Sequence, residues 1–157
     1  MGAEGLLAGR VAVVTGGGGG IGRGVCRRLA AEGALVVVND IDPELLAETE
    51  AELEADGGFI RPVAGDIREQ ATVEALTTAA HQVADGRIDV LVNNVGDFRP
   101  NGMFLKSGPE EWDALYALNL GHVFACTRAM APAMTERSSG SIVNVSTVEA
   151  FRGIPAN

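Results

Sequence analysis

A run of glycines is the part of the sequence best suited to binding a ligand. It occupies residues 15–22 (TGGGGGIG) and joins a β-branched run, Val11–Val14, to a segment with helical spacing. Glycines permit a sharp turn and let the backbone approach a pyrophosphate that a Cβ atom would keep at a distance. The first turn of the following helix offers unpaired N–H groups and the positive end of its dipole to an anion. The run therefore predicts a phosphate-binding loop, and a flexible surface loop is the alternative.

The surroundings of the glycine run make the first interpretation more specific. The general spacing GxGxxG fits Gly17, Gly19 and Gly22, although five consecutive glycines satisfy many spacings. More informative is the order of strand, turn and helix, followed by an acid, Asp40, roughly 20 residues further along the chain. This order is typical of dinucleotide-binding folds. An ordinary loop carboxylate is the alternative interpretation of Asp40.

Elements of two kinds alternate along the chain and would position these residues. Short runs of β-branched and apolar residues predict five strands, at Val11–Val14, Ala34–Asn39, Phe59–Ala64, Ile88–Val92 and Gly140–Val145. Apolar residues at helical spacing lie between them, and the longest predicted helix runs from about Pro109 to Met134. The alternation predicts an α/β fold with a doubly wound parallel sheet and helices on both faces. Ligands of such sheets bind at the carboxyl ends of the strands.

Local signals predict how the helices begin and how two elements are placed. The pair Asp42-Pro43 predicts an N-cap followed by proline in the first helical turn. Ser107 and Glu110 have the spacing of a capping box at the start of the longest helix. Pro62 predicts an edge position for the third strand. The face of the first helix that packs against the sheet is predicted from apolar residues four apart: Ile21, Val25 and Leu29.

The composition predicts one globular domain over residues 1–157. Hydrophobic residues make up 46% of the chain and charged residues 21%, and the net charge is −9. The basic residues are scattered, so we expect no nucleic-acid partner. No apolar run approaches the ~18 residues that span a bilayer, and the first ten residues do not resemble a secretory signal. We therefore expect no membrane partner.

The cysteines and histidines predict neither disulfides nor a metal site. Cys26 and Cys126 lie far apart in segments with helical spacing, which favours reduced, buried thiols in a cytoplasmic protein. His81 and His122 have no partners at the spacing of metal ligands. We interpret both histidines as ordinary helix residues and expect no bound metal.

The residues that flank the glycines resemble the cofactor loop of short-chain dehydrogenases/reductases. Thr15 and the pair Ile21-Gly22 define the pattern TGxxxGIG. Its three fixed glycines are Gly16, Gly20 and Gly22. The resemblance continues in order over all 157 residues. It implies a Rossmann-like fold, a bound nicotinamide dinucleotide, and hydride transfer between that cofactor and a small alcohol or carbonyl substrate.

The same resemblance implies that NAD is preferred over NADP. Asp40 follows the second strand, where a carboxylate can accept hydrogen bonds from both ribose hydroxyls of NAD and would repel the 2′-phosphate of NADP. Members of the family that prefer NADP place a basic residue just before the second motif glycine or beside the Asp40 position. Gly19 and Ile41 occupy those places here.

Further segments match motifs of the family in the order of the chain. Asp66-Ile67, after the third strand, matches residues that contact the adenine. Asn93-Asn94-Val95-Gly96 resembles the NNAG motif, which ties neighbouring strands together and lines the adenosine side. Asn119 matches the asparagine that holds a proton-relay water in the family. Thr147 stands at the usual place of the catalytic serine, with Ser146 one place earlier, and its hydroxyl can still bond a substrate carbonyl.

The family's catalytic tyrosine, and the lysine four residues after it, have no counterpart in these 157 residues. Leu120 follows Tyr116 by four residues, and Lys106 precedes it. We therefore expect the chain to be the C-terminally truncated, NAD-binding part of such a dehydrogenase, and to be inactive by itself. A non-catalytic dinucleotide-binding module or partner subunit is one alternative, and a truncated product without function is another.

The resemblance also implies a homo-oligomer in the complete protein. In the family, the helix that carries the tyrosine and lysine packs beside the longest helix found here and forms much of a dimer interface. Without that helix, we expect exposed residues and an association surface among the large side chains of the longest helix: Trp112, Leu115, Phe124 and Met130.

Overall fold

The β-branched runs form one parallel sheet in the computed structural model, which describes residues 5–97 and 104–148. The strands are β1 (Val11–Thr15), β2 (Leu35–Asp40), β3 (Phe59–Ala64), β4 (Val90–Asn93) and β5 (Ser141–Asn144). Their order across the sheet is β3-β2-β1-β4-β5, and every neighbouring pair is parallel. The five predicted strands and the doubly wound sheet are therefore confirmed, as is the edge position of the strand that contains Pro62.

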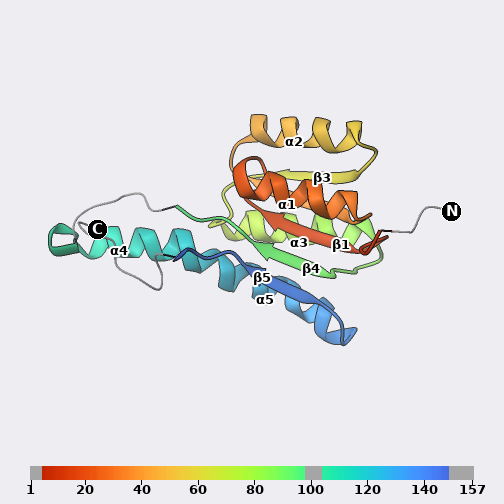
Figure 1. Ribbon diagram of the computed structural model, residues 1–157. Helices are drawn as coiled ribbons and strands as arrows, with labels where there is room; N and C mark the ends of the chain where they lie inside the picture. Colours follow the sequence, from red (N-terminus) through yellow and green to blue (C-terminus); the bar gives the residue numbers. More distant parts are fainter. Residues whose placement is uncertain (1–4, 98–103, 149–157) are drawn as a thin grey trace.

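Helices connect the strands and cover the sheet (Figure 1). They are α1 (Gly20–Ala31), α2 (Pro43–Ala55), α3 (Gln70–Val83), α4 (Pro109–Tyr116) and α5 (His122–Glu136), with a 3₁₀ turn, η1 (Phe104–Lys106), before α4. A π-helical segment, η2 (Ala117–Gly121), joins α4 directly to α5. In Figure 1, α4 projects beyond the carboxyl ends of β4 and β5. No helix within the described ranges is long and apolar enough to cross a membrane.

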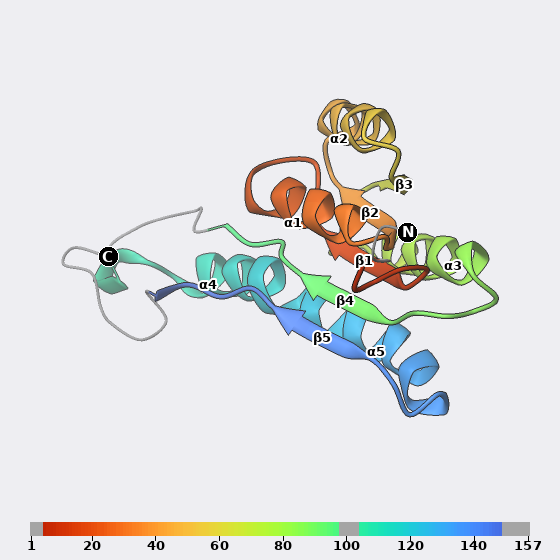
Figure 2. The ribbon, with the colours of Figure 1, turned by 45° about the vertical axis from the view of Figure 1, so that its right-hand side comes forward.

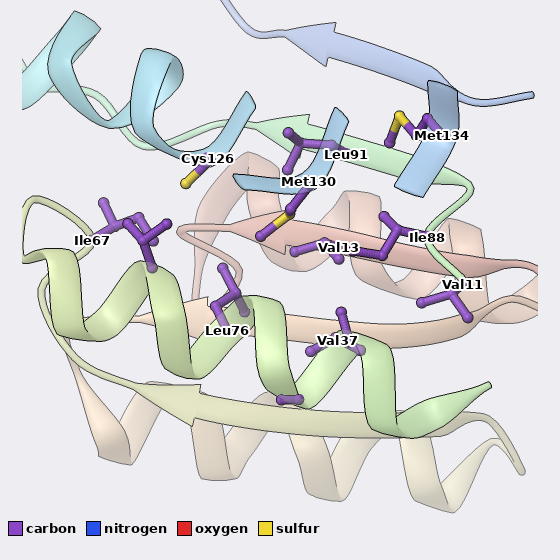
Figure 3. Close-up of a cluster of buried hydrophobic side chains, with 13 residues drawn as sticks. Val11, Val13, Val37, Ile67, Leu76, Ile88, Leu91, Cys126, Met130 and Met134 are labelled. Carbon is purple, nitrogen blue, oxygen red and sulfur yellow. The ribbon is translucent and has the colours of Figure 1, made fainter. Parts of the chain in front are cut away.

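Side chains that alternate along each strand bury both faces of the sheet. Val11 and Val13 of β1 belong to one buried cluster, which α3 and α5 complete with Leu76, Met130 and other side chains (Figure 3). Ala12 and Val14 belong to a second cluster that α1 and α2 complete. Figure 2 shows α1 and α3 on opposite sides of β1. This two-sided burial explains why the strands are continuous apolar runs.

Two predictions about buried helix faces were wrong. Ile21 is 69% exposed, and the face of α1 that packs on the sheet begins instead with Gly22 and Cys26. Val25 and Leu29 are partly buried and pack against the cluster of Ala12 and Val14, so that part of the predicted face is confirmed. Only its start at Ile21 was wrong, because a glycine has no side chain for an apolar pattern to register. Met130, which we expected among the exposed residues, is fully buried under the sheet.

The predicted start of one helix is confirmed, and that of another is wrong by one residue. Asp42 caps α2, because its Oδ1 accepts hydrogen bonds from the backbone N–H groups of Glu44 and Leu45 at 2.9 and 3.2 Å. At α4 the N-cap is Gly108, and Glu111, not Glu110, accepts the N-cap N–H at 2.7 Å. Pro109 at the first helical position sets this register.

The two edges of the sheet differ in how well they are covered. β3 lies at one edge beside α2. β5 lies at the other edge, with all four residues exposed, including Ile142 and Val143 on its two faces. The sequence predicts a loop over the last dozen residues, and from residue 149 on these lie outside the part of the chain that the structure describes.

Candidate functional site

A cleft of about 230 Å³ opens at the carboxyl ends of β1 to β4. The strand order reverses here, because β2 and β3 lie on one side of β1 and β4 and β5 lie on the other. Every strand end that the sequence pointed to, except that of β5, contributes to it. Its lining residues are Gly16, Asn39, Asp40, Ile41, Gly65, Asp66, Ile67, Arg68, Asn94, Val95, Gly96 and Leu118.

The glycine loop needs glycine at the three positions of the TGxxxGIG register. Gly16 and Gly20 have φ angles of +66° and +51°, in the left-handed region that side chains disfavour. At Gly22 a Cβ atom would lie 1.9 Å from the carbonyl oxygen of Gly16, so α1 approaches the loop too closely for any side chain. A Cβ at Gly19 would meet no atom closer than 3.9 Å, which favours this register over GxGxxG.

Thr15 and Asn94 tie the ends of β1 and β4 together beneath the loop. The Thr15 hydroxyl, which is fully buried, accepts hydrogen bonds from the backbone N–H groups of Asn94 and Val95 at 3.0 and 3.3 Å. The Asn94 side-chain amide donates to the carbonyl oxygens of Thr15 and Gly16, both at 3.0 Å. These bonds hold the first motif glycine beside the end of β4.

Asp40 lies at the cleft with its carboxylate held by backbone groups. Its Oδ2 accepts a hydrogen bond from the Gly18 N–H at 2.8 Å, and its Oδ1 accepts one from the Asp42 N–H at 3.1 Å. A carboxylate has about four acceptor sites, so capacity remains for two ligand hydroxyls. The acid and the glycine loop, which are 22 residues apart in sequence, are therefore in direct contact.

Asp66 and Arg68 form an ion pair that lines the cleft after β3, the strand next to β2. The Arg68 Nε lies 2.9 Å from each Asp66 oxygen, a second guanidinium nitrogen also bonds Oδ2, and the Arg68 backbone N–H donates to Oδ1 at 2.9 Å. The hydrogen bond from the Arg68 side chain lowers the pKa of the Asp66 carboxyl, against a smaller opposing effect of burial. Ile67 between them is 3% exposed and joins the buried cluster of the α3 face.

The Asn93–Gly96 segment divides between structural and cleft-lining residues. Asn93 is buried and does not line the cleft; its Nδ2 donates to Asn144 Oδ1 at 2.8 Å and so ties β4 to β5. Val95 and Gly96 line the cleft. A Cβ on Gly96 would lie 3.0 Å from the Asn119 side-chain oxygen, so the two residues approach each other closely.

Asn119 lies in the π-helical segment and fastens the loop after β4. Its Oδ1 accepts from the Asp97 N–H at 3.0 Å, and its Nδ2 donates to the Asp97 and Leu115 carbonyl oxygens, both at 2.9 Å. Both N–H groups of the amide are therefore used within the protein, and the remaining lone pair of Oδ1 is what the side chain keeps for a water.

Ser146 and Thr147 follow β5 and have exposed side chains. The Val145 N–H bonds the Asn93 carbonyl oxygen at 2.9 Å, so the parallel pairing of β4 and β5 extends to this point. Both hydroxyls thus lie at the carboxyl edge of the sheet, as predicted.

Six residues that line the cleft were not predicted as site residues: Asn39, Ile41, Gly65, Arg68, Asn94 and Leu118. Asn94 was noted only as a letter of its motif, Arg68 lies two residues past a predicted contact, and Leu118 precedes Asn119. An arginine two residues after an acid at a strand end is a signal that sequence reasoning could have used. Leu118 belongs to the π-helical segment and lines the cleft from there. The sequence pattern did not predict this segment.

Known proteins share both the sequence and the fold of this chain. A family model for short chain dehydrogenases matches residues 10–157. The 2,3-dihydro-2,3-dihydroxybenzoate dehydrogenase of Bacillus subtilis is 36% identical over 155 residues, which are 99% of this chain and 58% of that protein. The short-chain reductase protein NovJ of Streptomyces niveus is 40% identical over 89% of this chain and 53% of its own length. The chain thus spans little more than half the length of these curated relatives.

Solved structures are also similar to this chain in sequence and fold. A metagenomic short-chain oxidoreductase in complex with NADP is 40% identical, has a TM-score of 0.86, and is matched over 94% of this chain and 66% of its own. A 7α-hydroxysteroid dehydrogenase complexed with NADH and a 7-oxo bile acid conjugate is 29% identical, with a TM-score of 0.87, over 94% of this chain and 57% of its own. The sheet order, the glycine register and these similarities lead to one conclusion: the chain belongs to the short-chain dehydrogenase family.

Proposed function

We propose that residues 1–157 form the cofactor-binding domain of an NAD-dependent oxidoreductase that transfers hydride between NAD and a small alcohol or carbonyl compound. The observation that carries the proposal is the direct contact between the glycine loop and Asp40 at the mouth of the cleft. In this arrangement the loop would bind the pyrophosphate and Asp40 the neighbouring ribose, as a dinucleotide requires.

The shape of the loop supports a bound dinucleotide. Gly16 and Gly20 adopt left-handed conformations, and Gly22 allows α1 to begin against the loop. The backbone can therefore approach a pyrophosphate at the N-terminus of α1. Thr15 would support the loop from below, and Ile21, which is exposed, would border the ligand. Asp66, Ile67, Val95 and Gly96 would line the adenosine side, and Asn93 would hold the strand ends in place.

Charge supports NAD over NADP. Asp40 faces the position of the adenosine ribose, where its carboxylate would repel a 2′-phosphate. Gly19 has no side chain and Ile41 is apolar, so neither supplies a cation for that phosphate. Arg68 lines the cleft, but its guanidinium is already paired with Asp66. Relatives with NADP and with NADH both exist, so Asp40 is what supports the finer assignment.

The residues that we propose for catalysis are Asn119, Thr147 and Ser146. The cofactor, when bound, supplies hydride transfer at its nicotinamide ring. The Thr147 hydroxyl would donate a hydrogen bond to the substrate carbonyl oxygen, with Ser146 as its neighbour, and this bond stabilises the charge that develops there. Asn119 would hold a water through the free lone pair of Oδ1, while its amide keeps the loop after β4 in position.

We propose further that the complete protein is a cytoplasmic homo-oligomer. Cys26 and Cys126 are free and buried, which suits a reducing compartment. An apolar stripe on α4, η2 and α5 consists of side chains that are between 47% and 64% exposed: Trp112, Tyr116, Leu120 and Phe124. A second copy of the chain would cover this stripe.

Titration calorimetry with NAD and NADP tests the proposal. We expect the wild-type protein to bind NAD more tightly than NADP. Asp40→Ala should weaken NAD binding about tenfold and raise the relative affinity for NADP. Asp42→Ser is the matched control, because a serine keeps the helix cap and the backbone N–H that holds Asp40.

The outcomes separate the parts of the proposal. Absence of binding by either dinucleotide would overturn it as a whole. An unchanged preference in Asp40→Ala would overturn the assignment of NAD. Binding of NAD by the full coding sequence, without turnover of any alcohol or carbonyl compound, would favour a non-catalytic module.

A further inference from the structure

The backbone of Gly18 is held from two sides by charged side chains. Its N–H donates to Asp40 Oδ2 at 2.8 Å. Its carbonyl oxygen accepts from the Arg23 Nε at 2.9 Å and also from a second guanidinium nitrogen of the same arginine. Gly18 is one of five consecutive glycines, so no side chain of its own limits its conformation.

Arg23 connects the glycine loop to α2. Beyond Gly18, its guanidinium reaches the Leu45 carbonyl oxygen at 3.3 Å and Glu48 Oε2 at 2.9 Å. The Arg23 side chain is 25% exposed, although it belongs to the first turn of a surface helix. An arginine in that position usually extends into water, and here it folds back over the loop.

Thr49 supports the same contact from α2. Its buried hydroxyl lies 3.2 Å from the Gly17 carbonyl oxygen, 3.3 Å from that of Gly18 and 3.0 Å from that of Leu45. Glycine loses more conformational freedom on ordering than any other residue, so a loop of five glycines needs bonds of this kind from outside. Arg23 supplies hydrogen bonds from a charged donor, its guanidinium group.

The contacts form one connected series from α2 to the acid at the cleft. Glu48 holds Arg23, Arg23 holds the Gly18 carbonyl, and the Gly18 N–H holds Asp40. A Cβ on Gly18 would lie 2.9 Å from the Asp40 carboxyl carbon and from the Leu45 Cβ, so the loop, the acid and α2 are in van der Waals contact at this point. A change in the Gly18 carbonyl direction would move the N–H that orients the carboxylate.

We propose that Arg23 is a positioning residue for the adenosine half of the cofactor. By fixing the Gly18 carbonyl against α2, it keeps the Gly18 N–H on Asp40 and so presents the Asp40 carboxylate to the ribose in one orientation. The proposal rests on the proposed NAD site. It goes beyond that site because Arg23 touches neither the ribose-binding acid nor the cleft and acts through the backbone.

Calorimetric binding of NAD to four variants tests the series. Arg23→Gln should weaken NAD binding about tenfold. Arg23→Lys should lose less, because an ammonium can still bond the Gly18 carbonyl, and it serves where the glutamine variant does not fold. Arg27→Gln is the control, since Arg27 lies on the same helix, is 58% exposed and pairs with Glu52 of α2 at 3.0 Å outside this series. In an Asp40→Ala background, Arg23→Gln should cost less than about threefold.

Amide hydrogen exchange of the protein without ligand separates this proposal from the NAD assignment. Arg23→Gln and Asp40→Ala should each accelerate exchange of the Gly18 amide, and Arg27→Gln should leave it nearly unchanged. Exchange of the Gly18 amide that does not respond to Arg23 would overturn the proposal even where NAD binds. So would an equal loss of NAD affinity from Arg23→Gln with and without Asp40. A protein that binds no dinucleotide but shows the expected exchange would overturn the proposed function alone.

Discussion

His122 is a histidine without hydrogen-bond partners in the interior of the protein. It is 1% exposed, and both ring nitrogens lack a partner within the described ranges. Burial lowers the pKa of its imidazole below the usual value of 6.5, against a smaller opposing effect of the Leu118 backbone. The sequence predicted an ordinary helix residue, because helical spacing shows that a residue lies on the buried face only when its type is apolar.

We predict that His122 makes the protein less stable in mild acid. Because the folded-state pKa lies below the unfolded value, the unfolded chain takes up a proton that the folded chain resists. The cost is absent well above pH 6.5, appears as the pH falls through about 6.5, and is complete below the folded pKa. His122→Leu should therefore be more stable than the wild type at pH about 5.5, with a smaller difference at pH about 7.5.

Guanidinium unfolding at these two pH values measures the effect. His81→Gln is the control for removal of a histidine, since His81 lies exposed on α3. A wild type and a His122→Leu variant that lose equal stability between the two pH values would contradict the prediction.

The contacts of the candidate site could be predicted from the sequence only where the proposed function requires a particular residue type at a particular position in a motif. Asp40 and the glycines of the loop meet that condition. Arg23 and Arg68 do not, because an arginine on a helix or in a loop is ordinarily solvated. Their contacts with Gly18 and Asp66 depend on how the backbone turns at two strand ends, which is decided by the sheet.

At the scale of elements, the strands were predictable and the longest helix was only partly so. A strand buried on both faces needs a continuous apolar run, which few other structures produce. The helix from Pro109 to Glu136 is interrupted by η2, which inserts a residue into the helical turn. The bonds from Asn119 to Asp97, 22 residues earlier in the chain, are contacts that local spacing cannot reveal.

We predict that Asn119→Ala loosens η2 and the loop after β4. The variant removes three hydrogen bonds, to the backbone of Asp97 and to the Leu115 carbonyl, and should lower the free energy of unfolding by about 2 kcal/mol. Asn119→Asp keeps the acceptor for the Asp97 N–H but loses both donors, so its loss should be of similar size. Gln82→Ala, at an exposed helix position, is the control.

Denaturant unfolding of the three variants checks this prediction. NAD titration provides a second measure, because Val95, Gly96 and Leu118 line the cleft beside η2. An Asn119→Ala variant as stable as the control would show that the π-helical segment does not depend on these bonds.

At the scale of the whole molecule, the sheet brings the residues of the candidate site together at the carboxyl ends of its strands. Apolar side chains are exposed elsewhere on the surface. The carboxyl ends of β1 to β4 meet at the cleft. The outer strand β5 and the stripe on α4, η2 and α5 expose apolar side chains, among them Val143 and Phe124. A monomeric protein rarely exposes a continuous apolar patch of this kind without a partner for it.

We predict that the stripe mediates self-association. Tyr116 and Phe124 are 57% and 64% exposed, so replacing both by glutamate should leave the fold intact while placing charges where a second copy would pack. The wild type should sediment at a multiple of the chain mass, and Tyr116→Glu/Phe124→Glu should shift it toward the monomer. Leu6→Glu is the control for an added glutamate, because it places one negative charge at an apolar residue that is 86% exposed elsewhere on the surface. Analytical ultracentrifugation over a range of concentrations decides the matter: a monomeric wild type, or a double variant that associates as strongly as Leu6→Glu, would contradict the prediction.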